Sequence, residues 1–133
     1  MGGYSKSGSS GKSGKSGKCG KAGKGGLTPL DWSIKIVPVS PGVAGFLPDV
    51  LGAQVGESLQ AQRCDIVTWG NTTTDTHQPV RTDNGQPLCA PIAAGGSSAP
   101  QFVVVDPVGT TIKYTCTFHK EEIGFITVVP NFT

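Results

Sequence analysis

The stretch from Tyr114 to Val129, YTCTFHKEEIGFITVV, decides the fold of this chain. Apolar and polar residues alternate around Cys116 and again after Gly124, and this period of two predicts two β-strands joined by a short loop. Cys116 stands near the end of the first strand, and His119 follows just after it. A cysteine and a histidine in those positions can project toward one point beyond the sheet, where loops from other strands also arrive.

The same alternation recurs along the chain from Leu27 onward. It is visible in WSIKIVPV (32–39), DIVTW (65–69) and QFVVVD (101–106), and no segment of useful length has the 3.6-residue period of a helix. Seven or eight short strands within residues 27–133 predict an all-β domain, a sandwich of two sheets. The segment 77–101 holds four prolines and three glycines, so we expect a long loop there with one short strand at most.

Residues 1–26 differ from the rest and consist almost entirely of glycine, serine and lysine. Six of the eleven basic residues lie there without an acid, whereas the remainder has five basic and nine acidic residues, so the charges are +6 and −4. This composition predicts a disordered, flexible basic arm in front of the domain. The arm is either a plain linker or an adhesive segment for a polyanion, cell wall or mineral surface. Nucleic acid fits less well, because no aromatic residues interleave with the lysines.

The location of the protein is predicted from what the sequence contains and lacks. No apolar run reaches the roughly 18 residues of a membrane-spanning helix, so we expect no membrane span. We expect an extracellular protein whose signal peptide has been removed. Two tripeptides, at Asn71 and Asn131, fit the N-glycosylation sequon. Cys19 in the arm offers a route to self-association, as do the edges of the sheets.

The second histidine of the chain, His77, follows the strand DIVTW by a short loop. With it, the sequence resembles the cupredoxins, the small blue-copper proteins, and is similar to amicyanin and plastocyanin. The resemblance rests on a V-x-W-x-N strand followed by histidine, and on the pattern Y-x-C-x-x-H with a later G-x-I-x-V. The matching residues here are Val67, Trp69, Asn71, His77, Tyr114, Cys116, His119, Gly124, Ile126 and Val128.

The resemblance implies a Greek-key β-sandwich with a mononuclear copper site. It assigns the metal to His77, Cys116 and His119, a set that suits both Cu(II) and Cu(I), because imidazole and soft thiolate favour different oxidation states. The function it implies is outer-sphere electron transfer with a redox protein partner, and we do not expect an enzyme. A catalytic cysteine and histidine pair is a weaker alternative, because Cys116 lacks the helix N-terminus that commonly activates such thiols.

The sequence departs from the family where an axial methionine is expected, since Glu122 stands there. A carboxylate in that place is a hard anionic ligand and would lower the reduction potential and alter the colour. The alternative is that Glu122 turns to solvent, as neighbouring Glu121 is expected to do. Asn71 is expected either to brace the site by hydrogen bonding to the loop of Cys116 or to carry a glycan facing outward, and the two exclude each other.

Two further interpretations of the function stay open, as does one covalent link. The protein could be a structural or matrix component that uses the sandwich as a scaffold and the arm for adhesion. It could also store or scavenge copper. A disulfide between Cys64 and Cys89 is expected to pin the long loop near the site, and the alternative is a buried free thiol at Cys64 with Cys89 paired elsewhere, for example with Cys19.

Overall fold

The computed structural model describes residues 29–130, and this part of the chain is an eight-stranded β-sandwich. The predicted arm (1–26), Cys19 and Asn131 lie outside the described residues. None of the described residues forms a helix, so no helix among them could cross a membrane. The strands are β1 (Asp31–Ser40), β2 (Val43–Pro48), β3 (Ser58–Gln62), β4 (Ile66–Asn71), β5 (Pro79–Arg81), β6 (Phe102–Val103), β7 (Thr111–Cys116) and β8 (Ile123–Val129).

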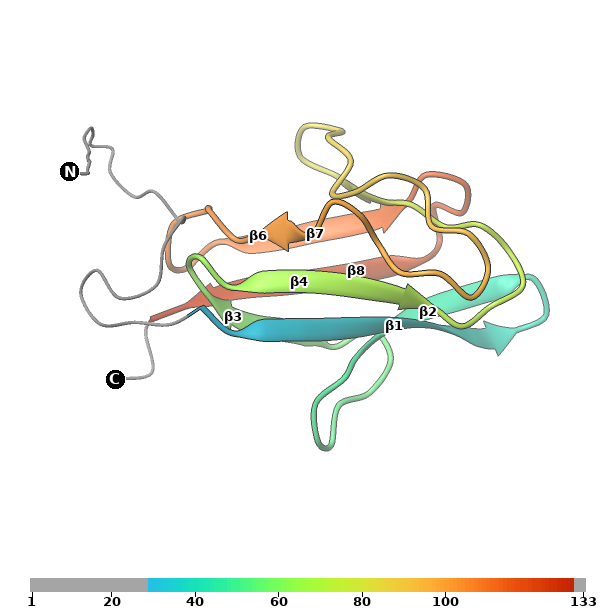
Figure 1. Ribbon diagram of the computed structural model, residues 1–133, viewed down its shortest axis with the longest axis horizontal. Helices are drawn as coiled ribbons and strands as arrows, with labels where there is room; N and C mark the ends of the chain where they lie inside the picture. The colour runs from blue at the N-terminus through green and yellow to red at the C-terminus, as the bar shows by residue number, and fades with distance from the viewer. Residues whose placement is uncertain (1–28, 131–133) are drawn as a thin grey trace.

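The strands form two four-stranded sheets that face each other (Figure 1). One has the order β2-β1-β4-β6 and the other the order β3-β8-β7-β5. In each sheet one pair is parallel, β1 with β4 and β3 with β8. The chain passes from one sheet to the other at every connection from β2 to β7, which confirms the predicted two-sheet Greek-key sandwich.

The inner faces of the sheets meet in a core that contains three large aromatic side chains. Phe46 in β2, Trp69 in β4 and Tyr114 in β7 are at most 1% exposed. The Tyr114 ring lies edge-on to both of the others, with centroid distances of 4.8 Å to Phe46 and 5.4 Å to Trp69. These contacts follow from the period of two, which turns every second side chain of β4 and β7 inward. Along β7, the last inward-facing residue is Cys116, which lies where the strand ends.

The predicted long loop is present between β5 and β6, and it packs against the sandwich (Figure 1). Leu88, Cys89 and Ile92 from this loop are buried. Isolated antiparallel bridges join Ile92 to His77 and Ser97 to Gly70. The loop thus holds the segment after β4 in place, and that segment carries one of the expected metal ligands.

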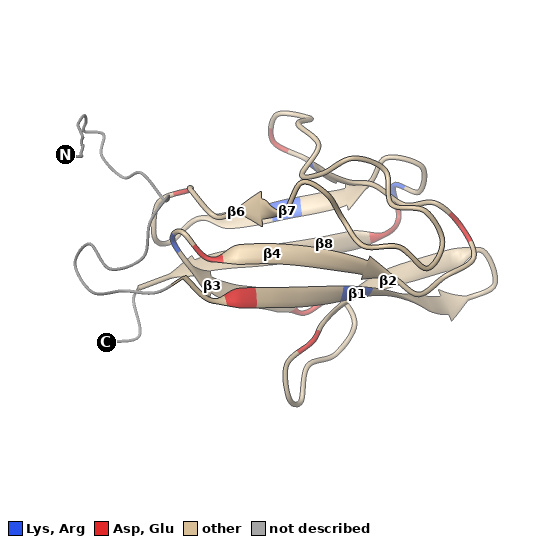
Figure 2. Cartoon of the chain, in the orientation of Figure 1, with Lys and Arg blue, Asp and Glu red and all other residues tan. Residues whose placement is uncertain are grey.

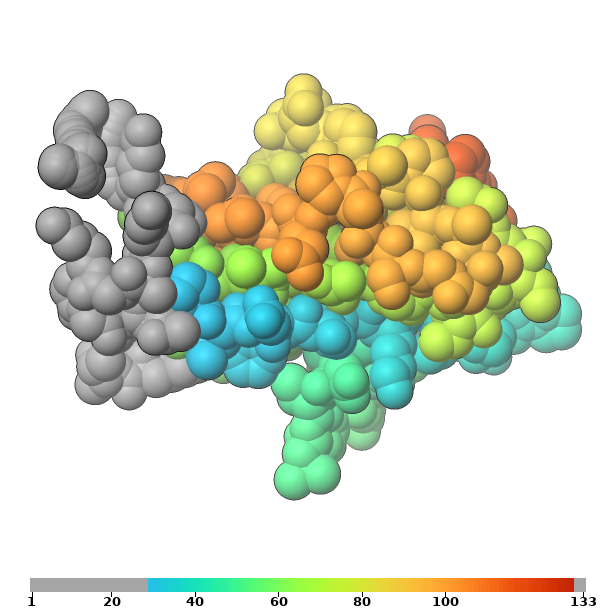
Figure 3. All heavy atoms as spheres, in the orientation of Figure 1, coloured from blue at the N-terminus to red at the C-terminus, as the bar shows by residue number. Residues whose placement is uncertain are grey.

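The connection from β2 to β3 projects from the sandwich as a separate lobe (Figure 3). Its tip exposes Leu51 completely, while Val55 at its base packs on β2. A Cβ atom at Gly45 would overlap the side chain of Val55, so a larger residue here would force Val55 to move. The charged residues are scattered along the described part of the chain (Figure 2).

Candidate metal centre

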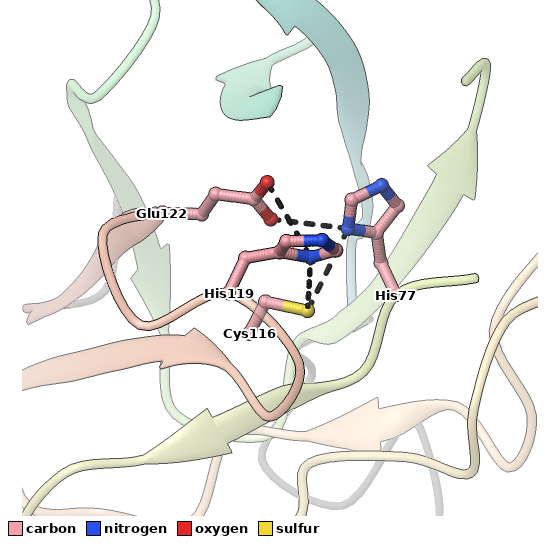
Figure 4. A group of neighbouring side chains, drawn as sticks. All are labelled: His77, Cys116, His119 and Glu122. Atoms are coloured by element: carbon pink, nitrogen blue, oxygen red, sulfur yellow. Dashed lines mark hydrogen bonds and ion pairs between the residues drawn. The ribbon is translucent and has the colours of Figure 1, made fainter. Parts of the chain in front are cut away.

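The four residues predicted as ligands lie together at one end of the sandwich (Figure 4). His77 comes from the connection between β4 and β5, Cys116 ends β7, and the two others lie in the short connection from β7 to β8. One nitrogen of each imidazole, the sulfur of Cys116 and a carboxylate oxygen of Glu122 all lie within 4.8 Å of one another. The structure therefore brings together residues separated by up to 45 positions in the sequence.

The chain from Cys116 to Glu122 turns with a period of three residues, and this turn brings three ligand side chains to one place. The His119 amide donates to the Cys116 carbonyl at 3.2 Å, and the Glu122 amide donates to the His119 carbonyl at 3.1 Å. Successive i to i+3 hydrogen bonds stack residues three apart on the same side of the turn. The spacing C-x-x-H-x-x-E thus places a thiol, an imidazole and a carboxylate over one point.

The distances between donor atoms fit a single bound ion. Cys116 Sγ lies 3.6 Å from His77 Nδ1 and 3.7 Å from His119 Nδ1. Nitrogen and sulfur atoms that share an ion such as zinc, at bond lengths of about 2.0 and 2.3 Å, lie roughly 3.5–3.7 Å apart in tetrahedral or trigonal arrangements. Glu122 adds oxygens 3.0 Å from His77 Nδ1 and 3.6 Å from His119 Nδ1.

The environment of Glu122 gives an independent indication that a cation belongs here. The residue is 2% exposed, so it does not turn to solvent. Its Oε2 accepts a hydrogen bond from the Ala44 amide at 2.9 Å, but Oε1 is buried without a hydrogen-bond partner in the described structure. A buried carboxylate oxygen is costly unless it is paired. Oε1 faces His77 Nδ1, and a metal ion held by both atoms would satisfy it.

The site is closed toward the core and open at one ligand. Cys116 and His77 are at most 1% exposed, whereas the His119 side chain is 27% exposed. A hollow of about 320 Å³ between residues 38–44 and 72–75 also reaches His77 and Glu122.

Two residues that support the ligands were not predicted from the sequence. The Gln78 amide points at Cys116 Sγ, 3.4 Å away, so the residue after one ligand donates to the sulfur of another. Thr73 Oγ1 lies 2.9 Å from His77 Nε2. No spacing signals either contact, because one comes from a backbone group and the other from one of several threonines in the same loop.

Asn71 faces inward, but it contacts different partners from those expected. It is 2% exposed, and its side-chain amide donates to the carbonyls of Asp75, Ile92 and Ala93. It braces the loop of His77 and not, as predicted, the loop of Cys116. The buried amide has no room for a glycan, so the prediction of glycosylation at Asn71 is not compatible with this fold.

The predicted disulfide between Cys64 and Cys89 does not form, because Cys89 is a free, buried thiol. Cys64 precedes the first residue of β4, while Cys89 lies beside Ser98, whose amide and hydroxyl bond to Trp69 within β4. The extended residues from Ile66 to Trp69, roughly 10 Å of strand, therefore lie between Cys64 and the position of Cys89 along β4. Burial raises the pKa of the Cys89 thiol to about 11, which keeps it protonated.

Comparisons with known proteins give similar structures but no similar sequence. No protein-family model matches the chain, and no curated protein matches it. A purple cupredoxin from Nitrosopumilus maritimus is 22% identical, with a TM-score of 0.53 over 72% of this chain and 97% of that one. The McoA multicopper oxidase from Aquifex aeolicus is 14% identical, with a TM-score of 0.51 over 76% of this chain and 27% of that one. A reduced Cu(I) form of an amicyanin variant is 16% identical, with a TM-score of 0.49 over 75% of this chain and 81% of that one.

Proposed function

From the cupredoxin fold that the structural similarities establish, we propose that this chain binds one copper ion through His77, Cys116 and His119 and transfers electrons. The observation that supports this most strongly is the convergence of two imidazole nitrogens and a buried thiol, with separations of 3.6 and 3.7 Å from the sulfur. Two imidazoles and one thiolate are the donor set of electron-transfer copper sites. Copper bound there would supply a one-electron Cu(II)/Cu(I) couple.

The protein's own part in electron transfer is to hold the ligands still and leave one of them accessible. Cys116 is fixed by its strand and by the Gln78 amide, and His77 is fixed by the bridge to Ile92. Ligands that do not move need little reorganisation when the charge of the ion changes. His119 is the exposed ligand, so we assign its ring edge as the port for electrons.

Glu122 would be a further ligand to the metal, because its Oε1 is buried without a hydrogen-bond partner and is aimed into the donor set. A carboxylate is a harder donor than a thioether and stabilises Cu(II) more than Cu(I), which lowers the reduction potential. The same preference would suit copper storage or scavenging, the second candidate function. That candidate differs from electron transfer in requiring tight retention of Cu(II) without rapid reduction.

Adding Cu(II) to the purified full chain tests the proposal. We expect an intense visible sulfur-to-copper charge-transfer band at one equivalent, and Cys116→Ser should abolish the band while the thermal unfolding transition is retained. Voltammetry then separates the two functions, because a reversible couple at an accessible potential supports electron transfer and irreversible reduction supports storage. Absence of the band in the unmodified chain would refute copper binding.

We propose electron transfer and not catalysis by the Cys116 and His119 pair. Cys116 is completely buried, so a substrate could not reach its sulfur in this fold. Reactive catalytic thiols are partly exposed and lie in electropositive surroundings. Here the nearest carboxylate, Glu122, adds negative charge instead.

We further propose an extracellular location and adhesion of the lysine-rich arm to a polyanionic or mineral surface. The +6 charge of residues 1–26 against the −4 charge of the remainder supports the proposed adhesion. A variant with the six arm lysines replaced by serine should lose binding to silica particles or acidic polysaccharide while its copper spectrum is unchanged. Equal binding by both proteins would eliminate the adhesion proposal and, with it, the matrix interpretation.

A further inference from the structure

Asn71 has one possible orientation, because backbone groups surround both ends of its side-chain amide. Its Nδ2 faces the carbonyl oxygens of Asp75, Ile92 and Ala93 at 2.6, 3.0 and 3.2 Å. Its Oδ1 accepts the Thr73 amide at 2.9 Å. Exchanging oxygen and nitrogen would place acceptor against acceptor and donor against donor. Oδ1 therefore points at Thr73.

The orientation of Asn71 decides the direction of the next hydrogen bond. Thr73 Oγ1 lies 2.7 Å from Asn71 Oδ1 and 3.2 Å from the Asp75 carbonyl oxygen. Both are acceptors only, so the single hydroxyl proton of Thr73 must go to one of them. A lone pair of Oγ1 is then left for His77 Nε2, 2.9 Å away, and that nitrogen must carry a proton.

We propose that Thr73 is the positioning residue that fixes the tautomer and ring orientation of His77. With its proton on Nε2, His77 presents the lone pair of Nδ1 to the donor set, 3.6 Å from Cys116 Sγ and 3.0 Å from Glu122 Oε1 (Figure 4). The opposite tautomer would leave the Thr73 hydroxyl and the Asn71 carbonyl, 2.7 Å apart, as two facing acceptors. The Nε2–H form instead turns the Nδ1 lone pair toward Glu122 Oε1, and a cation bound between those two atoms would relieve that contact. The inference rests on the proposed function only in that Nδ1 is the atom that must bind the metal.

Nuclear magnetic resonance of metal-free protein labelled with ¹⁵N-histidine tests the inference. The chain has two histidines, so the ring nitrogens of His77 can be assigned without overlap. The unmodified chain should carry the proton on Nε2. Thr73→Val removes the hydroxyl, and the proton should then move to Nδ1, where Glu122 Oε1 accepts it. Thr73→Ser should restore Nε2 protonation, and Thr74→Val, at an exposed neighbour in the same loop, should change nothing.

Copper affinity supplies the second measurement. Loss of the group that orients a ligating histidine weakens metal binding about 10- to 100-fold, and we expect that loss for Thr73→Val but not for Thr73→Ser. An unprotonated Nε2 in the unmodified chain would overturn the inference even if Thr73→Val failed to fold. So would an unchanged proton position and affinity in Thr73→Val. If the proton moves as expected but the unmodified chain binds no copper, the proposed function fails and the assignment of Thr73 stands.

Discussion

Replacing Gly124 with alanine should destabilise the domain, because the ring of Tyr114 already occupies the space above this glycine. Gly124 in β8 pairs directly with Tyr114 in β7. A Cβ atom at Gly124 would lie 2.5 Å from the Tyr114 hydroxyl oxygen and 2.6 Å from Cε1, well inside van der Waals contact. The pattern Y-x-C with a glycine eight residues after the cysteine thus has a steric basis in this fold.

The size of the effect follows from how little the Tyr114 ring can move. It is 1% exposed, wedged against Phe46 and Trp69, and its hydroxyl accepts a hydrogen bond from Trp69 Nε1 at 3.2 Å. Overpacking a core costs about 1–3 kcal/mol. Loss of the hydrogen bond adds about 0.5–1.5 kcal/mol. Alanine recovers about 0.5–1 kcal/mol relative to glycine in chain entropy, so we expect a net loss near 2 kcal/mol.

Urea unfolding of the metal-free protein measures this change, with Gly70→Ala as the matched control. Gly70 lies in β4, and a Cβ atom there would meet no atom within 4 Å, so its replacement should not lower the unfolding free energy and should raise it by about 0.5–1 kcal/mol through chain entropy alone. In a Tyr114→Leu background the cost of Gly124→Ala should largely disappear, because the obstructing ring is gone. Equal effects at Gly124 and Gly70, or an undiminished cost in the Tyr114→Leu background, would refute the steric argument.

Three further predictions concern buried polar groups. Glu122→Gln and Glu122→Met should shift the visible spectrum of the copper-loaded protein, raise its reduction potential and weaken Cu(II) binding about tenfold or more. Glu121→Gln, at the exposed neighbour, should change none of these properties. An unchanged spectrum in the Glu122 variants would show that Glu122 is not a ligand. Burial raises the pKa of the Cys89 thiol to about 11, so little of it is thiolate at pH 8 and it should resist iodoacetamide until the protein unfolds. Peptide mass spectrometry measures the labelling, and modification of Cys89 in the folded protein would contradict the prediction. Asp65→Ala should lower the unfolding free energy by about 3 kcal/mol, because the buried carboxylate accepts hydrogen bonds from two backbone amides and from the Trp32 indole. A loss under about 1 kcal/mol in chemical denaturation would contradict this prediction.

The fold could be predicted from the sequence because its signals are local. Alternating residues in β4 and β7 turn Trp69 and Tyr114 inward, and the strand count and the long loop follow from the same pattern together with proline and glycine positions. The prediction that Cys64 pairs with Cys89 was wrong, because it took the long loop after β4 to return to the start of that strand. The loop instead runs alongside β4 and places Cys89 beside Ser98, far from the start of that strand.

The candidate ligand set could be predicted through the resemblance to the cupredoxins, and the structure shows that three of its four members lie in one turn with a period of three residues. Its supports were not, because they depend on register and loop path. Gln78 contributes a backbone amide, and Ala44 does so from the opposite sheet. Asn71 was expected to serve the loop of Cys116, but the bridge between His77 and Ile92 directs its amide to the loop of His77.

The contact between Ala44 and Glu122 explains why a carboxylate can replace a thioether at this position. A thioether needs no hydrogen bond, whereas a carboxylate buried to this extent has two oxygens that must be satisfied. The Ala44 amide satisfies Oε2 from the first sheet and leaves Oε1 turned toward His77. No Lys or Arg side chain among the described residues forms an ion pair with Glu122, so the positive charge that Oε1 lacks has to come from the site itself. A divalent ion would balance a thiolate and a carboxylate, and a monovalent ion would leave one negative charge buried. A metal bound with Glu122 among its ligands would therefore be favoured in its oxidised state.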